Sequence, residues 1–82
     1  MLFRSPADEL RARAVALATE LAQGPTRAFA RMRALLRDAW HNDLATQLQS
    51  EIQALTATAD TADAAEALSA FRAKRTPRFT GG

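Results

Sequence analysis

The sequence predicts an all-α fold: three to four amphipathic helices with short loops, forming a single helical domain over residues 1–82. Alanine is the commonest residue, followed by leucine and arginine, and all three are strong helix formers. β-Branched residues are sparse, and no useful length of chain alternates polar and apolar residues as a half-buried strand would. Residues that cap or break helices divide the chain into four segments of helical periodicity.

The first helix is expected to begin near Pro6, with Ser5 as its N-cap, and to end at Gly24 in the usual glycine position after a helix. Acids in its first turn would interact favourably with the positive end of the helix dipole. An apolar stripe runs along this segment at spacings of three and four residues: Leu10, Ala14, Leu17 and Leu21. The segment is interpreted as a capped surface helix.

Thr26 is predicted to cap a second helix that runs to about Trp40 and carries a wide apolar face. Arginines lie mostly off that face, a pattern typical of a solvated helix surface. Asn42 or Asp43 is predicted to cap a third helix, which continues the apolar stripe to about Thr58.

The last helix is predicted to be capped by Asp60 or Thr61 and to run to about Lys74. The hydrophobic core is expected to form from large apolar residues on the stripes of the first three helices: Leu17, Phe29, Met32, Leu36, Leu48 and Ile52. A chain of 82 residues can build only a small core, so its stability is expected to be marginal.

Composition excludes several classes of protein. There is no cysteine and only one histidine, His41, so neither a thiolate metal site nor a Ser/His/Asp triad can be assembled from this chain. No apolar run approaches the roughly 20 residues that a membrane span needs. The stretch before the first acids is too short for a signal peptide. We therefore expect a cytoplasmic protein without a membrane partner.

The net charge is +2, and ten of the eleven basic residues are arginine. This excess of basic residues, nearly all of them arginine, raises the possibility of a nucleic-acid partner. Acids are interspersed with the bases through most of the chain, however, and only the short segment from Arg72 to Arg78 carries one sign. This pattern disfavours nucleic acid as a partner. A free-standing helical adaptor or a weak nucleic-acid-binding helical module remains the alternative to the function given below.

Three acids could share one face of the last helix, because Asp60, Asp63 and Glu66 are spaced three residues apart. They also suit the first turns of a helix, where acids stabilise the dipole. No nucleophile motif, phosphate-binding loop or metal-ligand spacing accompanies them. From its residues alone the chain is therefore expected to hold no catalytic residue and no metal site.

The end of the chain carries an ordered set of residues: Asp63-x-x-Glu66, then Ala70-Phe71-x-x-Lys74-Arg75-x-Pro77-x-Phe79-x-Gly81. This pattern resembles the C-terminal signature of the enoyl-CoA hydratase/isomerase (crotonase) family. Upstream, Asn42-x-Leu44-x-x-Gln47-Leu48 resembles isomerases of the phenylacetate-pathway branch. The resemblance covers nearly the whole chain but only the C-terminal helical region of the family, whose β/α core with its catalytic groups is expected to be absent.

The resemblance implies a function as well as a fold. In that family the C-terminal helices cover the core and build the contact between subunits, and a Phe and a Lys reach the CoA held by a neighbouring subunit. By motif these residues are Phe71 and Lys74. The resemblance therefore implies a homo-oligomer, a crotonase-type core as partner and an acyl-CoA substrate for the full-length protein. The chain alone is expected to bind no cofactor and to catalyse nothing.

A simpler interpretation of the same residues stays open at this point. A Phe on an amphipathic helix usually packs in a core, and a Lys-Arg pair in the last turn of a helix usually interacts with free carbonyls and the helix dipole. On that interpretation Phe71, Lys74 and Arg75 would serve only the fold.

Overall fold

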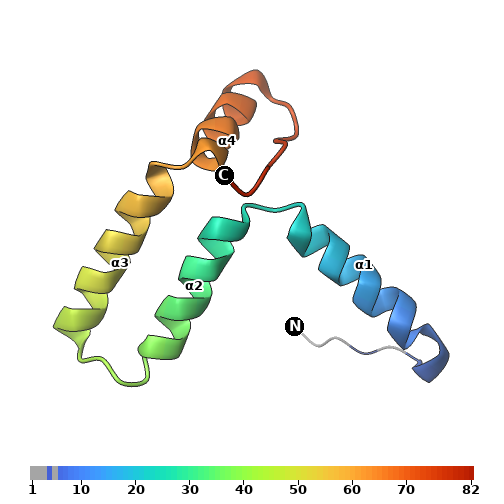
Figure 1. Cartoon of the computed structure of the whole chain (residues 1–82), viewed down its shortest axis with the longest axis horizontal. Coiled ribbons are helices and arrows are strands. Elements are labelled where there is room, and N and C mark those ends of the chain that lie inside the picture. The colour runs from blue at the N-terminus through green and yellow to red at the C-terminus, as the bar shows by residue number, and fades with distance from the viewer. Residues whose placement is uncertain (1–3, 5) are drawn as a thin grey trace.

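The protein, described by a computed structural model at residue 4 and residues 6–82, is a thin arrangement of helices (Figure 1). A short 3-10 helix precedes four α-helices: η1 (Ala7–Glu9), α1 (Leu10–Ala22), α2 (Thr26–Asp38), α3 (Leu44–Ala59) and α4 (Ala62–Ala73). The described residues contain no strand, which confirms the predicted all-α class. The molecule measures 46 × 38 × 19 Å, and its smallest dimension is less than two helix diameters of roughly 10–12 Å each.

The main contacts between α-helices are those that α3 makes with α2 and with α4. α2 packs against α3 as an antiparallel hairpin, and α3 contacts α4 at the end of the hairpin where α2 begins (Figure 1). α1 diverges from the hairpin, and the C-terminal end of the chain returns past α4 toward the loop between α1 and α2 (Figure 1). No second layer of described residues covers the faces of these helices.

Two of the predicted N-caps are confirmed. The Asp43 carboxylate accepts a hydrogen bond of 2.8 Å from the backbone N–H of Thr46 at the start of α3. This bond lowers the pKa of Asp43, because it stabilises the charged carboxylate. The Thr61 hydroxyl accepts a bond of 3.1 Å from the N–H of Ala64 at the start of α4. Each bond satisfies one of the N–H groups that a helix start leaves without a partner.

Other predicted helix ends are wrong. Pro6 precedes the 3-10 turn instead of opening an α-helix, and its predicted cap, Ser5, lies outside the described residues. Thr26 is the first residue of α2 rather than its N-cap, and Pro25 before it makes no capping bond. α2 ends at Asp38, short of Trp40, because the chain turns there and the Asp38 carbonyl accepts bonds from the next loop.

Gly24 follows α1 as predicted, but for a different physical reason. Its backbone does not lie in the left-handed region that favours glycine after a helix. A Cβ at this position would lie 2.5 Å from Cε2 of Phe29, well inside the van der Waals distance. Glycine therefore leaves room for an aromatic ring from α2, which would have to move if the residue carried a Cβ.

The side chain of Gln47 ties α3 to the end of α2. Its Nε2 donates to the Leu35 carbonyl at 3.2 Å, and its Oε1 accepts from Nδ2 of Asn42 at 3.1 Å. These bonds fix the hairpin turn, whose half-buried amides have few other partners. In this chain the Asn42-x-Leu44-x-x-Gln47 pattern thus has a structural role. His41, in the same turn, is exposed.

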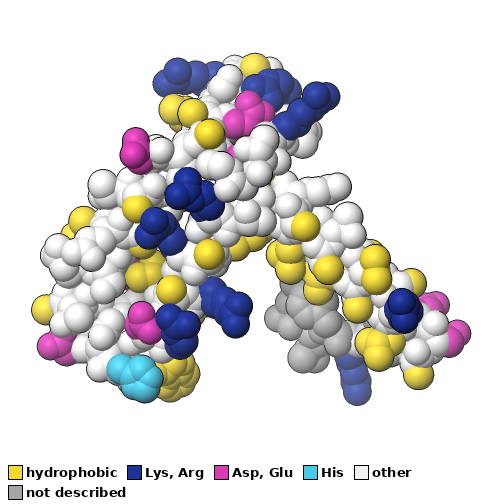
Figure 2. All heavy atoms as spheres, in the orientation of Figure 1, with side chains coloured by type: hydrophobic (Ala, Val, Ile, Leu, Met, Phe, Trp, Pro, Cys, Tyr) yellow, Lys and Arg dark blue, Asp and Glu magenta, His cyan; other side chains and the backbone are white. Residues whose placement is uncertain are grey.

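The predicted core is wrong for five of its six residues. Leu17, Met32, Leu36, Leu48 and Ile52 are all exposed, and only Phe29 is partly buried. The described residues that are buried are Thr61, Asp63 and Ala70, all at or on α4. The apolar stripes exist as predicted, but a single layer offers them no facing surface. Figure 2 shows apolar side chains on the visible surface of several helices.

None of the helices in the described part of the chain has both the length and the hydropathy needed to cross a membrane.

Candidate functional site

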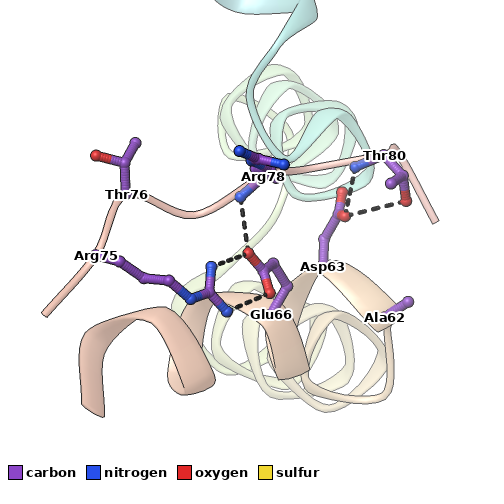
Figure 3. A pocket seen from close by; sticks show the side chains of 7 residues that line it. All are labelled: Ala62, Asp63, Glu66, Arg75, Thr76, Arg78 and Thr80. Atoms are coloured by element: carbon purple, nitrogen blue, oxygen red, sulfur yellow. Dashed lines mark hydrogen bonds and ion pairs between the residues drawn. The ribbon is translucent and has the colours of Figure 1, made fainter. Parts of the chain in front are cut away.

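A group of hydrogen bonds joins α4 to the C-terminal tail (residues 75–82), which folds back along this helix (Figure 3). Two carboxylates on α4, Asp63 and Glu66, are three residues apart and so share one face of the helix. Both point toward the tail (Figure 3). They hold it at two separate places, which are described in turn.

Asp63 holds the far end of the tail. Its Oδ1 accepts from the backbone N–H of Thr80 at 2.8 Å, and its Oδ2 accepts from the N–H of Gly81 at 2.9 Å. The backbone N–H of Asp63 in turn donates to the Gly82 carbonyl at 3.0 Å. Only 3% of Asp63 is exposed, and a carboxylate this buried is stable only when donors compensate for lost water.

Gly81 permits this contact. Its φ of +82° lies in the left-handed region, where residues with a Cβ are strained. A Cβ there would also lie 3.0 Å from Oγ1 of Thr26, at the start of α2. The glycine therefore lets the tail reach both Asp63 and the loop between α1 and α2. Phe79, partly buried, lines a small cavity with Pro25 of that loop and with Ala28 in the first turn of α2.

Glu66 holds the near end of the tail. Its two oxygens accept from both terminal nitrogens of Arg75, at 2.7 and 2.9 Å, which is a bidentate ion pair. The oxygen bonded to Nη1 also accepts from the backbone N–H of Arg78 at 2.8 Å. The Arg75 hydrogen bonds, followed by that of Arg78, lower the pKa of Glu66 from 4.5 to about 2. Glu66 is therefore charged at neutral pH.

These bonds cross the hollow between α4 and the tail (Figure 3). It is lined by the residues that hold the tail: Ala62, Asp63, Glu66, Arg75, Thr76, Arg78 and Thr80. Its two carboxylates already accept from backbone and guanidinium donors. No group of acids and histidines among the described residues could hold a metal ion. The hollow thus joins helix to tail, and the predicted role of these acids at the helix dipole is incomplete.

Lys74 ends α4 in the left-handed conformation, with φ 54° and ψ 42°. It is the only described residue other than glycine with a positive φ. The N–H of Arg75 donates to the Ala70 carbonyl at 3.0 Å, and the N–H of Lys74 donates to the Phe71 carbonyl at 3.2 Å. This is the Schellman pattern, in which glycine is the usual residue at the left-handed position.

The two residues predicted to bind CoA are both exposed. Phe71, in the last turn of α4, is 82% exposed, and Lys74 is exposed just beyond it. The Lys74 ammonium makes no hydrogen bond or ion pair within the described part of the chain. The simpler interpretation is therefore wrong for Phe71, which is not in a core. For Arg75 the expected partner is wrong, because its guanidinium binds Glu66 instead of helix carbonyls, but this contact still serves the fold.

The hold of Asp63 and Glu66 on the tail could not be derived from periodicity, because the partners lie up to 18 residues away. The available signal was the motif itself: two acids at helical spacing, followed by an arginine and then by glycine in an irregular segment. Such a pattern is typical of a helix whose acids bind the backbone that follows it.

The comparisons with known proteins agree with this geometry. The sequence model of the enoyl-CoA hydratase/isomerase family matches residues 4–82, and the chain belongs to that family. A solved structure of an enoyl-CoA hydratase from Geobacillus kaustophilus HTA426 superimposes with a TM-score of 0.88 at 28% sequence identity. The match covers 94% of this chain but 29% of that one. The all-α region is thus a part of the crotonase fold. No curated protein matches the sequence significantly.

Proposed function

We propose that this chain is the C-terminal oligomerisation and CoA-edge region of an enoyl-CoA hydratase/isomerase. In this role Phe71 and Lys74, here called the CoA-edge pair, contact the nucleotide end of an acyl-CoA bound by a neighbouring subunit. The groups that polarise the acyl carbonyl and move protons would belong to a β/α core. The chain itself is then a binding region and not a catalytic one.

The backbone of Lys74 is the observation that carries this proposal. A side chain with a Cβ is held in the left-handed conformation where glycine would cost nothing. Such strain costs roughly 1–2 kcal/mol and is characteristic of positions where the side chain itself is needed. The Lys74 ammonium does not stabilise the fold through a hydrogen bond or ion pair, because it has no partner among the described residues. A bound anion would supply the missing partner.

The chemistry of the pair suits the nucleotide end of CoA. An exposed aromatic ring can stack on adenine, and an ammonium can pair with a phosphate. Both residues belong to one helix end, since the N–H of Lys74 bonds the carbonyl of Phe71 at 3.2 Å. Arg75 is already paired with Glu66, which leaves fewer free cations at this end for a nucleic-acid surface.

The exposed apolar stripes support the oligomerisation part of the proposal. Large apolar side chains are exposed on all four helices, among them Leu17, Leu36, Leu55 and Phe71. Large apolar side chains exposed on several helices are typical of a surface that contacts another protein. In the proposed arrangement the occupants are the β/α core and neighbouring subunits of the same enzyme.

The test is kinetic and uses this chain fused to the β/α core of a family member. Lys74→Ala should raise the KM for acyl-CoA by about 3- to 10-fold and leave kcat nearly unchanged, as expected when an interaction equal in ground and transition states is lost. Arg11→Ala, which removes a charge on α1, is the matched control and should change neither constant. An unchanged KM for Lys74→Ala would refute the proposed role of the pair.

A further inference from the structure

We infer that Glu66 is a positioning residue for the CoA-edge pair: by binding Arg75 and Arg78 it fixes the backbone of Lys74 beside Phe71. This inference rests on the proposed function of that pair. It adds a residue that would not touch the ligand, and its own test separates its failure from that of the proposal above.

Glu66 binds two residues that follow Lys74 in the chain, Arg75 and Arg78. The carboxylate lies on α4, while its donors are the guanidinium of the residue directly after Lys74 and the N–H of Arg78. Lys74 is therefore the one residue between the end of α4 and the first residue that Glu66 holds. Its dihedral angles must bring the chain back toward α4, and the left-handed conformation does this in a single residue.

The helix end alone does not explain why a lysine stays in that conformation. The Schellman bonds of Lys74 and Arg75 favour the left-handed turn, but glycine is the residue that usually makes it. A charged, bidentate pair is stronger than an ordinary hydrogen bond and has directional geometry. The pair between Glu66 and Arg75 therefore favours the backbone course in which Lys74 adopts this conformation.

Asp63 does not share this role, although it also binds the tail. Its acceptors bind Thr80 and Gly81, which are separated from Lys74 by five residues or more, with Pro77 between them. Loss of Glu66 would therefore release the segment around Lys74 and leave the far end of the tail attached. This separation makes a local test possible, since the change should not unfold α4.

The first measurement is structural and uses the 82-residue chain. In Glu66→Gln, the amide keeps the shape of the side chain but offers one acceptor oxygen and no charge. Three-bond couplings measured by NMR should show loss of the positive φ at Lys74, and the Arg78 amide should exchange faster. Glu51→Gln, an exposed acid on α3, is the matched control and should leave both unchanged. A positive φ retained at Lys74 in Glu66→Gln would overturn the inference.

The second measurement is a double-mutant cycle in the fusion enzyme. Glu66→Gln should raise the KM for acyl-CoA by about 3- to 10-fold without a change in kcat, and should add nothing when Lys74 is already Ala. If the two substitutions multiply each other's effects on KM, Glu66 acts independently of Lys74 and the inference is overturned.

The single variants separate the inference from the proposed function. If Lys74→Ala raises KM and Glu66→Gln does not, the inference fails and the proposed function stands. If Lys74→Ala has no effect, both fail.

Discussion

At the scale of a single residue, Lys74 both ends α4 and belongs to the proposed CoA-edge pair. Its left-handed backbone ends α4, and its exposed ammonium has no partner within the described chain. Glycine is the residue that most often ends a helix in this conformation, because it avoids the Cβ clash. Helix termination favours glycine at this position, whereas the proposed binding role requires a lysine side chain.

This conflict predicts a stabilising substitution. Lys74→Gly should raise the free energy of unfolding by about 1 kcal/mol, which corresponds to a Tm roughly 4–8 °C higher for a chain of this size. Thermal unfolding followed by circular dichroism would measure it. Arg72→Gly, inside the last turn of α4, is the control and should destabilise by about 1 kcal/mol. A lower Tm for Lys74→Gly would contradict the assigned strain.

The lowered pKa of Glu66 predicts that the free energy of unfolding depends on pH. Its pKa falls from 4.5 to about 2 in the folded chain, because Arg75 and Arg78 bind the charged form. A lowered folded pKa gives a stabilising contribution that is fully present above pH 4.5 and is lost as the pH falls toward 2. The Tm difference between the native chain and Glu66→Gln should therefore shrink across that window. A constant difference from pH 7 to 2 would be the contrary result.

At the scale of elements, α4 and the tail behave as one unit joined to the α1–α2 loop. Asp63 and Glu66 bind the tail, while Phe79 and Gly81 lie against the start of α2. The tail has no regular secondary structure, so its backbone donors depend on these two carboxylates. Its position is thus set by side chains of α4 rather than by a ladder of backbone bonds.

Removing Asp63 should release the far end of the tail. Asp63→Ala leaves the N–H groups of Thr80 and Gly81 without their acceptor, at a cost of about 1–3 kcal/mol. Hydrogen exchange of these two amides should accelerate strongly. Asp60→Ala removes an exposed acid three residues earlier and should leave the exchange unchanged. Protection of Thr80 and Gly81 that survived Asp63→Ala would disprove the attachment.

The elements themselves were largely predictable from sequence, because their signals are local. The Asp43 and Thr61 caps and the apolar periodicity lie within a few residues of the helices that they define. The core was not predictable in the same way. Periodicity identifies which face of a helix is apolar, but burial of Leu36 or Ile52 requires a second layer that these residues do not provide.

The candidate site was likewise predictable only where its signal is local in the sequence. Phe71 and Lys74 were identified by the motif, and the structure places both on the surface at one helix end. The hold of Asp63 and Glu66 on the tail was missed, since a helix-dipole role explained the same acids from local spacing alone. Contacts between residues 9 to 18 positions apart in an irregular segment leave no periodic signal.

At the scale of the whole molecule, the chain has little interior. Only Ala70 among the described apolar residues is fully buried, at 1% exposure, while Trp40 is 89% exposed. In water, association is the way in which a chain with this distribution would reduce its exposed apolar area. The faces proposed to cover a β/α core are exposed here, and we expect them to make contacts between copies of the chain.

The purified chain is accordingly expected to associate. Light scattering at high micromolar concentration should give a mass above one chain per particle. Replacing two exposed leucines, Leu36→Gln and Leu55→Gln, should shift the mass toward the monomer with little loss of helix, because side chains more than 70% exposed contribute little to folding. A strictly monomeric native chain would contradict this expectation.

The central claim is that the CoA-edge pair works only beside a core, and calorimetric titration of CoA tests it most directly. An exposed ion pair is worth about 0–1 kcal/mol, whereas a millimolar Kd requires about 4 kcal/mol, so the chain alone should show no binding at millimolar CoA. The fusion with a β/α core should bind CoA, and Lys74→Ala should weaken that binding by about 3- to 10-fold. Micromolar binding by the chain alone, or binding by the fusion that does not depend on Lys74, would contradict the account.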